Sequence, residues 1–246
     1  WTMLTWMAAR YPGPMLGTVV MCNSFRNPSL LAKMSASLQE MSMGRLILGY
    51  GAGWYEDEYR SYGFDYPSAG VRVDMFEEGV QIIKKMWVDS PANFRGKYYQ
   101  INNVYCEPRP DPQPVLMLGG GGERKTLRVV AQYADWWNDV MRPIPDLSRK
   151  LEVLKQHCEA VGRDYNSIRK TLAPRFFIDK NHRKAISMAE GKNDAGQVIA
   201  GDPAAVCDQL HELAEMGFDM VVTTFPKFQE LDDMKLFVED VIPQFS

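Results

Sequence analysis

Short apolar runs and longer amphipathic runs alternate six times along this chain of 246 residues. The apolar runs are rich in Val, Leu and Ile, which is typical of strands that are covered on both faces. They lie at residues 15–21, 45–54, 115–118, 136–140, 171–178 and 219–225. A run with helical spacing follows each of them. Strict alternation of this kind predicts an α/β fold with a parallel sheet and crossover helices.

Two architectures share this pattern, a doubly wound open sheet and a (β/α)8 TIM barrel of about 250 residues. Six units are two fewer than a closed barrel contains. Residues 1–11, however, are patterned like a helix that is already under way, as expected for a barrel that lacks its first two strand–helix units. We therefore expect residues 1–246 to form one amino-terminally incomplete barrel domain, with the open sheet as the alternative.

Residue types that start and stop helices support this division. Asn27 is a suitable cap with Pro28 in the first turn behind it, and Gly44 is expected to end that helix. Asp202 followed by Pro203 predicts a second capped start.

Two stretches interrupt the alternation. Residues 89–114 are too polar and proline-rich for a barrel strand, and we expect a hairpin or loop excursion there with Arg95 and Gly96 at its turn. Residues 180–201 form a long, weakly patterned segment. We expect a loop there, either a lid over a ligand or a mobile surface loop.

Composition and motifs narrow the classes of function. The net charge of −3 comes without a basic stripe, so we expect no nucleic-acid partner. No apolar run approaches the ~20 residues of a membrane span, and we expect a cytoplasmic protein without membrane contact. The four cysteines are far apart and the three histidines fit no metal spacing, so we expect reduced thiols and no metal site. A Gly-x-Ser-x-Gly elbow of a serine hydrolase is also missing.

Glycine and small polar side chains gather where the predicted strands end. In both candidate folds ligands bind at the carboxyl ends of the strands. Gly119, Gly120, Gly121 and Gly122 lie between a strand and a helix that we expect to begin near Glu123. Free N–H groups at a helix start attract anions, and a backbone without Cβ atoms lets a phosphate approach closely. Arg124 and Lys125 would add positive charge.

The alternative interpretation of the four glycines is a tight turn, for which one glycine would suffice. A Walker A loop does not fit, because Glu123 stands where that loop requires Lys. Four glycines therefore favour a ligand.

A second glycine cluster, residues 49–53, follows the second strand. It matches a dinucleotide fingerprint only weakly, and we favour close packing of this backbone against a flat ring. Trp54 and Tyr55 come next and are suited either to stack on a ligand or to pack in the core. Polar residues that include Asn23 and Asn138 follow two other strands and are placed to line a pocket.

The stretches GTVVMCNSFRNPSLLAKM, GRLILGYGAGWYEDEYRSYGFDYPSAGVRVDMFEEGVQIIKKMW, FRGKYYQ and VLMLGGGGERKTLRVVAQYADWWN together resemble the luciferase-like monooxygenase superfamily. The stretch DPAAVCDQLHELAEMGFDMVVTTFP is similar to its last barrel unit. The likeness extends over essentially the whole chain and is greatest to the branch of oxidoreductases that use the deazaflavin coenzyme F-420 (F420).

The resemblance implies a (β/α)8 barrel whose first two strands would precede Trp1, a homodimer, and hydride transfer between F420 and a small organic substrate. An FMN-dependent monooxygenase of the same superfamily is the alternative, and a non-catalytic barrel without cofactor is a third. The resemblance also implies a non-proline cis peptide at Val19–Val20 against the ring, with residues 51–53 beside it and residues 119–122 at the phosphate. The expected cofactor-binding set is Val19, Val20, Asn23, Gly51, Ala52, Gly53, Gly119, Gly120, Gly121, Gly122 and Asn138.

The catalytic group stays unassigned. Trp54 stands where some deazaflavin dehydrogenases carry a glutamate proton donor, and the histidine of those enzymes belongs to the part that would precede Trp1. The protein would mainly orient the cofactor, which carries the hydride.

Overall fold

The computed structural model describes residues 1–192, 198–225 and 231–245. Its main element is a parallel sheet, which confirms the α/β prediction. The strand order is β1-β3-β6-β7-β8-β11, with β2 paired to β3. The strands are β1 (Leu16–Gly17), β2 (Met21–Cys22), β3 (Leu46–Gly51), β6 (Val115–Gly119), β7 (Trp136–Val140), β8 (Arg169–Ala173) and β11 (Met220–Val221). Within the described residues β1 and β11 do not pair with each other, so the sheet stays open there.

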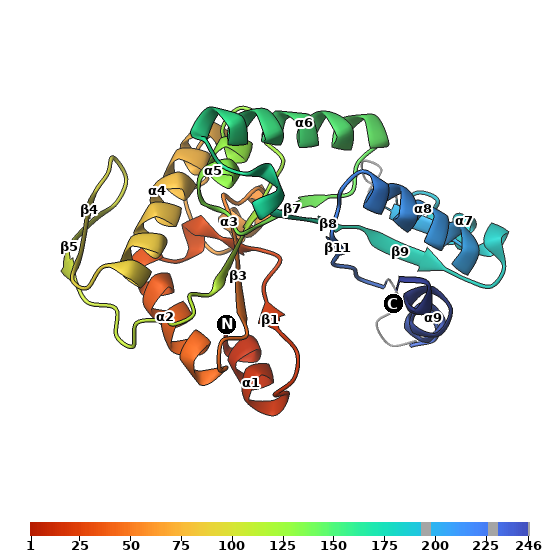
Figure 1. The fold of residues 1–246 in the computed structure, drawn as a ribbon, viewed down its shortest axis with the longest axis horizontal. Coiled ribbons are helices and arrows are strands. Elements are labelled where there is room, and N and C mark those ends of the chain that lie inside the picture. Colours follow the sequence, from red (N-terminus) through yellow and green to blue (C-terminus); the bar gives the residue numbers. More distant parts are fainter. Residues whose placement is uncertain (193–197, 226–230, 246) are drawn as a thin grey trace.

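The described helices are α1 (Thr2–Arg10), α2 (Pro28–Met41), α3 (Glu56–Ser61), α4 (Ala69–Val88), α5 (Thr126–Tyr133), α6 (Ile144–Val161), α7 (His182–Ala189), α8 (Pro203–Glu215) and α9 (Asp232–Leu236). Of these, α2, α4, α5 and α6 lie along the outside of the sheet (Figure 1). One apolar core joins strands and helices, with Leu48, Leu116 and Leu118 of the sheet packed with Phe76 and Val80 of α4. None of the helices in the described ranges is both long enough and apolar enough to cross a membrane.

Both predicted helix caps are confirmed. The Asn27 side chain accepts a hydrogen bond from Ser29 N at 2.9 Å, and Asp202 accepts one from Ala205 N at 3.0 Å. Each satisfies an N–H group that the first helical turn leaves without a partner. The helical pattern of residues 1–11 is confirmed by α1.

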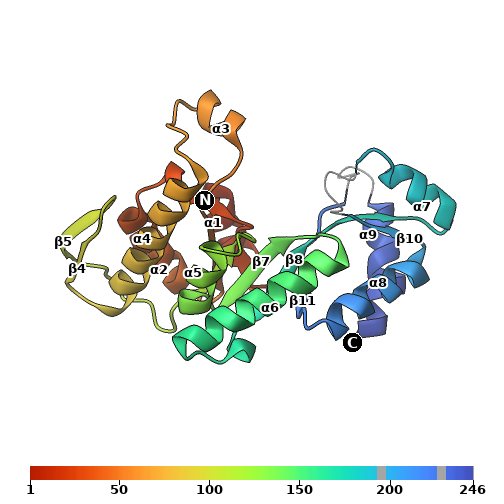
Figure 2. The same ribbon diagram turned by 90° about the horizontal axis from the view of Figure 1, so that it is seen from above.

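The fifth predicted strand, residues 171–178, is wrong as a single strand. The chain leaves the main sheet after Ala173, and β9 (Arg175–Ile178) pairs instead with β10 (Val198–Gly201) in a separate parallel pair. Pro174 lies at the break, and since proline has no N–H it cannot continue a ladder of hydrogen bonds. Figure 2 shows this pair with α7, α8 and α9 as a lobe beside the main sheet.

The expectation of a loop over residues 180–201 is wrong for the part that the structure describes. That segment holds α7 and β10, and residues 193–197 lie outside the described residues. The pattern of α7 is weak because only two of its eight residues, Ala185 and Ala189, are buried, and both have small side chains.

The hairpin in residues 89–114 is confirmed. β4 (Ala92–Arg95) and β5 (Gln100–Val104) are antiparallel, and Arg95 ends the first strand. The Glu78 carboxylate of α4 accepts hydrogen bonds from the backbone N–H groups of Lys97, Tyr98 and Tyr99 at 2.6–2.9 Å. This contact fixes the tip of the hairpin on α4.

Candidate functional site

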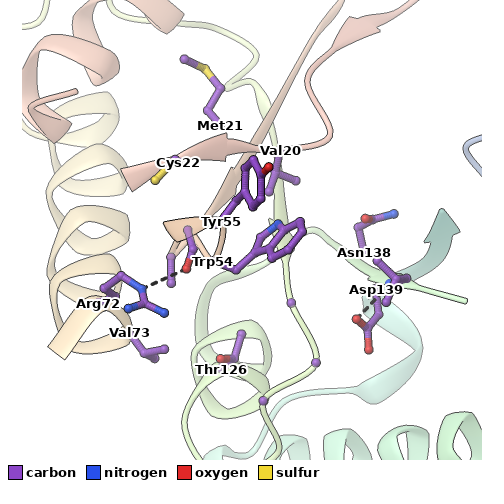
Figure 3. A pocket seen from close by; sticks show the side chains of 18 of the residues that line it. Val20, Met21, Cys22, Trp54, Tyr55, Arg72, Val73, Thr126, Asn138 and Asp139 are labelled. Atoms are coloured by element: carbon purple, nitrogen blue, oxygen red, sulfur yellow. Dashed lines mark hydrogen bonds between the residues drawn. The ribbon is translucent and has the colours of Figure 1, made fainter. Parts of the chain in front are cut away.

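The carboxyl ends of the neighbouring strands surround one cavity of about 440 Å³ (Figure 3). Ten of the expected cofactor-binding residues share its lining, namely Val19, Val20, Gly51, Ala52, Gly53, Gly119, Gly120, Gly121, Gly122 and Asn138. The lining also includes Met21, Cys22, Trp54, Tyr55, Glu58, Tyr59, Ala69, Arg72, Val73, Thr126, Asp139, Val140 and Ala173. Segments that are far apart in the sequence thus meet where parallel α/β folds bind ligands.

Asn23 differs from the expectation, because it is not among the residues that line the cavity. It is 1% exposed, accepts a hydrogen bond from the Tyr50 hydroxyl and donates one to the Tyr99 hydroxyl at 3.1 Å. Its side chain therefore joins β3 to the hairpin. Asn138 does line the cavity and donates to Thr171 Oγ1 at 2.8 Å.

Val20 forms the apolar floor of the cavity. The peptide between Val19 and Val20 is cis, as the resemblance implied. The chain interrupts the first predicted strand here, so that residues 18–20 separate β1 from β2. A Cβ on Gly51 would lie 2.8 Å from Val20 Cγ2, closer than real side chains approach. Glycine in the neighbouring strands thus makes room for this valine.

The glycine segment, residues 119–122, is shaped by its own neighbours. A Cβ on Gly121 would collide with the Asp139 carboxylate and lie 2.9 Å from Lys150 Nζ, and one on Gly122 would lie 2.7 Å from Thr126 Oγ1. Gly120 has a φ of +126°, which other residues rarely adopt. Of the four, only Gly120 requires glycine for its backbone angle, and the close contacts at Gly121 and Gly122 are to side-chain atoms. The interpretation that four glycines favour a ligand stays a prediction.

The helix after this segment begins later than predicted. Residues 123–125 form a turn, and α5 starts at Thr126 rather than near Glu123. The backbone N–H groups of Gly121, Gly122 and Glu123 make no hydrogen bond within the described residues, and neither does the Thr126 hydroxyl. Unpaired donors at the start of a helix can bind an anion.

Arg72 supplies the positive charge of the cavity. Its side chain is only 7% exposed, and Nε donates to the carbonyl oxygen of Gly53 at 3.1 Å while Nη1 donates to that of Pro67. The guanidinium group also lies 4.0 Å from the centre of the Tyr66 ring. In the part of the chain that the structure describes, no carboxylate pairs with it. A buried cation without an anion is costly, so this geometry suits a negatively charged ligand.

The two cations expected from the sequence do not take this role. Lys125 pairs with Asp74 at 2.5 Å, and Arg124 is exposed and does not line the cavity. Arg72 was missed because it occurs within an amphipathic helix, where arginine is ordinary. Its position between Val71 and Val73 could have indicated an arginine on the apolar face of the helix.

Tyr59 contacts separate segments that form the wall of the cavity. Its hydroxyl lies 3.0 Å from Cys22 Sγ, donates to Ser24 Oγ at 2.9 Å and approaches the Ala52 carbonyl oxygen at 3.3 Å. Burial, and next the hydrogen bond with Cys22, raise the pKa of Tyr59 well above its usual range. The phenol therefore stays neutral and connects β2 to the segment after β3.

Trp54 and Tyr55 do not belong to the core. Trp54 is 79% exposed and Tyr55 is 50% exposed, so the interpretation of the pair as core residues is wrong. Both line the cavity, and Figure 3 labels them next to Val20 in this view. Within the described residues, no group of His, Cys, Asp and Glu could hold a metal ion.

Comparison with known proteins defines the family. Residues 1–196 match the family model of the luciferase-like monooxygenases, and the chain belongs to this family. An F420-dependent glucose-6-phosphate dehydrogenase of Amycolatopsis mediterranei is 25% identical over 282 residues, which cover 98% of this chain and 83% of that protein.

Solved structures share the fold of this chain. The coenzyme F420 dependent tetrahydromethanopterin reductase of Methanopyrus kandleri superposes with a TM-score of 0.84 at 20% identity, over 100% of this chain and 87% of the other. The oxygenating constituent of 3,6-diketocamphane monooxygenase from Pseudomonas putida, solved with FMN, gives a TM-score of 0.70 at 18% identity, over 93% and 79%. The curved sheet is thus part of a TIM barrel of the luciferase-like type.

Proposed function

We propose that this protein is an F420-dependent oxidoreductase that transfers a hydride between the deazaflavin and a small organic substrate. The cavity offers three matching parts, an apolar floor for a flat ring, a set of unpaired donors for a phosphate, and an open side for a substrate. The names of similar proteins, among them F420-dependent dehydrogenases and a reductase, support the choice of cofactor.

The observation that carries the proposal is the buried Arg72, which lines the same cavity as the glycine segment. A flat ring on Val20 would have its tail directed to Arg72, to the N–H groups of residues 121–123 and to Thr126. Charge-assisted hydrogen bonds from such donors are among the strongest that proteins form. When bound, F420 would supply the hydride acceptor or donor, and these residues would hold and orient it.

FMN is the second candidate, since an FMN complex exists within the same fold. Both cofactors are flat tricyclic rings with a phosphate on the tail, so the floor and the donors suit either. The similarity of this chain to F420-dependent proteins along 98% of its length favours the deazaflavin.

Titration of the purified protein with F420 and with FMN tests the proposal. Absorbance and fluorescence of each cofactor would report binding, with riboflavin as a control that has the ring without a phosphate. We expect F420 to bind at micromolar or lower concentration and FMN at least about tenfold more weakly. Tight binding of FMN with no binding of F420 would contradict the proposed cofactor.

A further inference from the structure

We propose that Trp54 and Tyr55 form an aromatic platform that binds the substrate, and that this substrate is a planar ring compound without negative charge. This inference deepens the proposed function and rests on it, because it assigns the substrate side of the same cavity. The substrate would lie between the platform and the cofactor ring on Val20.

The platform consists of two large aromatic rings that the protein leaves uncovered at a cavity. Their ring centres are 5.3 Å apart and the rings are inclined by 44°. Tryptophan is highly buried on average, so an indole that is 79% exposed beside a cavity indicates a surface for a ligand. Aromatic faces bind other flat rings by offset stacking.

The backbone that carries the platform is held in place. The carbonyl oxygen of Trp54 accepts a hydrogen bond from the Tyr66 hydroxyl at 2.8 Å. The preceding carbonyl, that of Gly53, accepts from Arg72 Nε at 3.1 Å. Two exposed rings on a fixed backbone lose little freedom when a ligand binds, which favours affinity.

The charges next to the platform select against anions. Three carboxylates, those of Glu56, Asp57 and Glu58, occupy the first turn of α3 directly after Tyr55. Glu56 pairs with Arg60, whereas the described residues provide no cationic partner for Asp57 or Glu58. Glu58 also lines the cavity.

Cations cannot offset these carboxylates at the platform. In the described lining Arg72 is the only cation, and the proposed function assigns it to the phosphate of the cofactor. Like charges placed together disfavour a partner, so a phosphorylated or carboxylated substrate should bind poorly here. This would distinguish the protein from a dehydrogenase that acts on a sugar phosphate.

A matched pair of probes tests both parts of the inference. 2-Naphthol and 2-naphthyl phosphate share one flat ring system and differ in the phosphate. Equilibrium dialysis against the full chain with oxidised F420 present would give both dissociation constants, and a separate F420 titration would be run for every variant. We expect 2-naphthol to bind about tenfold or more tightly than 2-naphthyl phosphate.

Variants separate stacking from folding. Trp54→Ala should weaken 2-naphthol binding about two- to tenfold, whereas Trp54→Phe should stay within about twofold of the parent protein. Tyr62→Ala removes a ring that is 75% exposed but does not line the cavity, and it should change neither probe. Asp57→Asn combined with Glu58→Gln should improve binding of 2-naphthyl phosphate about threefold or more.

Each outcome decides a different point. Equal binding of 2-naphthol to the parent protein and Trp54→Ala would overturn the platform, and equal binding of both probes to the parent protein would overturn the selection against anions. If F420 fails to bind while 2-naphthol still depends on Trp54, the proposed cofactor is wrong and the platform is supported.

Discussion

Val20 rests on Gly119, since a Cβ on that glycine would lie 2.8 Å from Val20 Cγ2 and 2.9 Å from Cγ1. Gly51 approaches the same valine from the adjacent strand β3, and Gly51 and Gly119 are paired in the sheet. The position of Val20 on the floor of the cavity therefore depends on these two glycines.

The substitution Gly119→Ala should push Val20 into the space of the cofactor ring. We expect F420 affinity to fall about tenfold and the free energy of unfolding to drop by about 1–3 kcal/mol, as for other overpacked sites. Gly13→Ala is the matched control, because a Cβ at Gly13 would meet nothing within 4 Å. Unchanged F420 affinity in Gly119→Ala would contradict the role given to Val20.

Replacing Arg72 by Met should remove the charge and retain much of the apolar stem. We expect F420 affinity to fall about ten- to a hundredfold, the range for hydrogen bonds to charged groups. The phosphate-free deazaflavin nucleoside should bind the variant and the parent protein alike. If both ligands are weakened equally, Arg72 acts through packing on Tyr66 and the phosphate assignment is wrong.

The hairpin tip should loosen when Glu78 is replaced by Ala. The backbone N–H groups of residues 97–99 would lose their shared carboxylate, and exposed amides exchange faster. We expect hydrogen exchange at these three amides to accelerate about tenfold or more. Glu40→Ala, an exposed change on α2, should leave their exchange unchanged; equal protection in both variants would refute the contact.

Stability should fall at alkaline pH. Burial raises the pKa of Tyr165 to about 12, and burial also raises the pKa of Tyr50 and of Tyr59 above the usual value near 10. Between pH 10 and 12 the folded state would keep protons that the unfolded chain has released. The stabilisation is therefore complete below pH 10 and is lost as pH rises, by at most about 1.4 kcal/mol per pH unit for each tyrosine.

Denaturant unfolding at pH 8, 10 and 11 would measure this decline. Tyr165→Phe should make the decline shallower, whereas Tyr62→Phe, at an exposed position, should follow the parent protein. A free energy of unfolding that stays constant from pH 8 to 11 would contradict the burial of these phenols.

The sequence predicted the sheet and its helices well because both depend on local periodicity and on capping residues such as Asn27 and Asp202. It failed where tertiary pairing decides the outcome. Pro174 divides one apolar run between two sheets, and nothing local indicates that Arg175–Ile178 would pair with Val198–Gly201.

The position of the candidate site was predictable from the sequence, whereas the contacts of its polar and charged side chains were not. Strand ends of a parallel sheet meet at one edge, and therefore ten expected residues line one cavity. Asn23 is buried away from the cavity because it bonds to Tyr50 of β3 and to Tyr99 of the hairpin tip. Arg72 has no carboxylate partner among the described residues because its neighbours are carbonyl oxygens. Neither the burial of Asn23 nor the lack of a carboxylate partner for Arg72 can be predicted from the residues next to them in the sequence.

The most direct test of the account is a crystal structure of the protein with F420 bound. We predict the deazaflavin ring against Val20 and the phosphate within hydrogen-bond distance of Arg72 and the backbone of residues 121–123. A ring bound elsewhere, or a phosphate that avoids Arg72 and the glycine segment, would contradict the central claim.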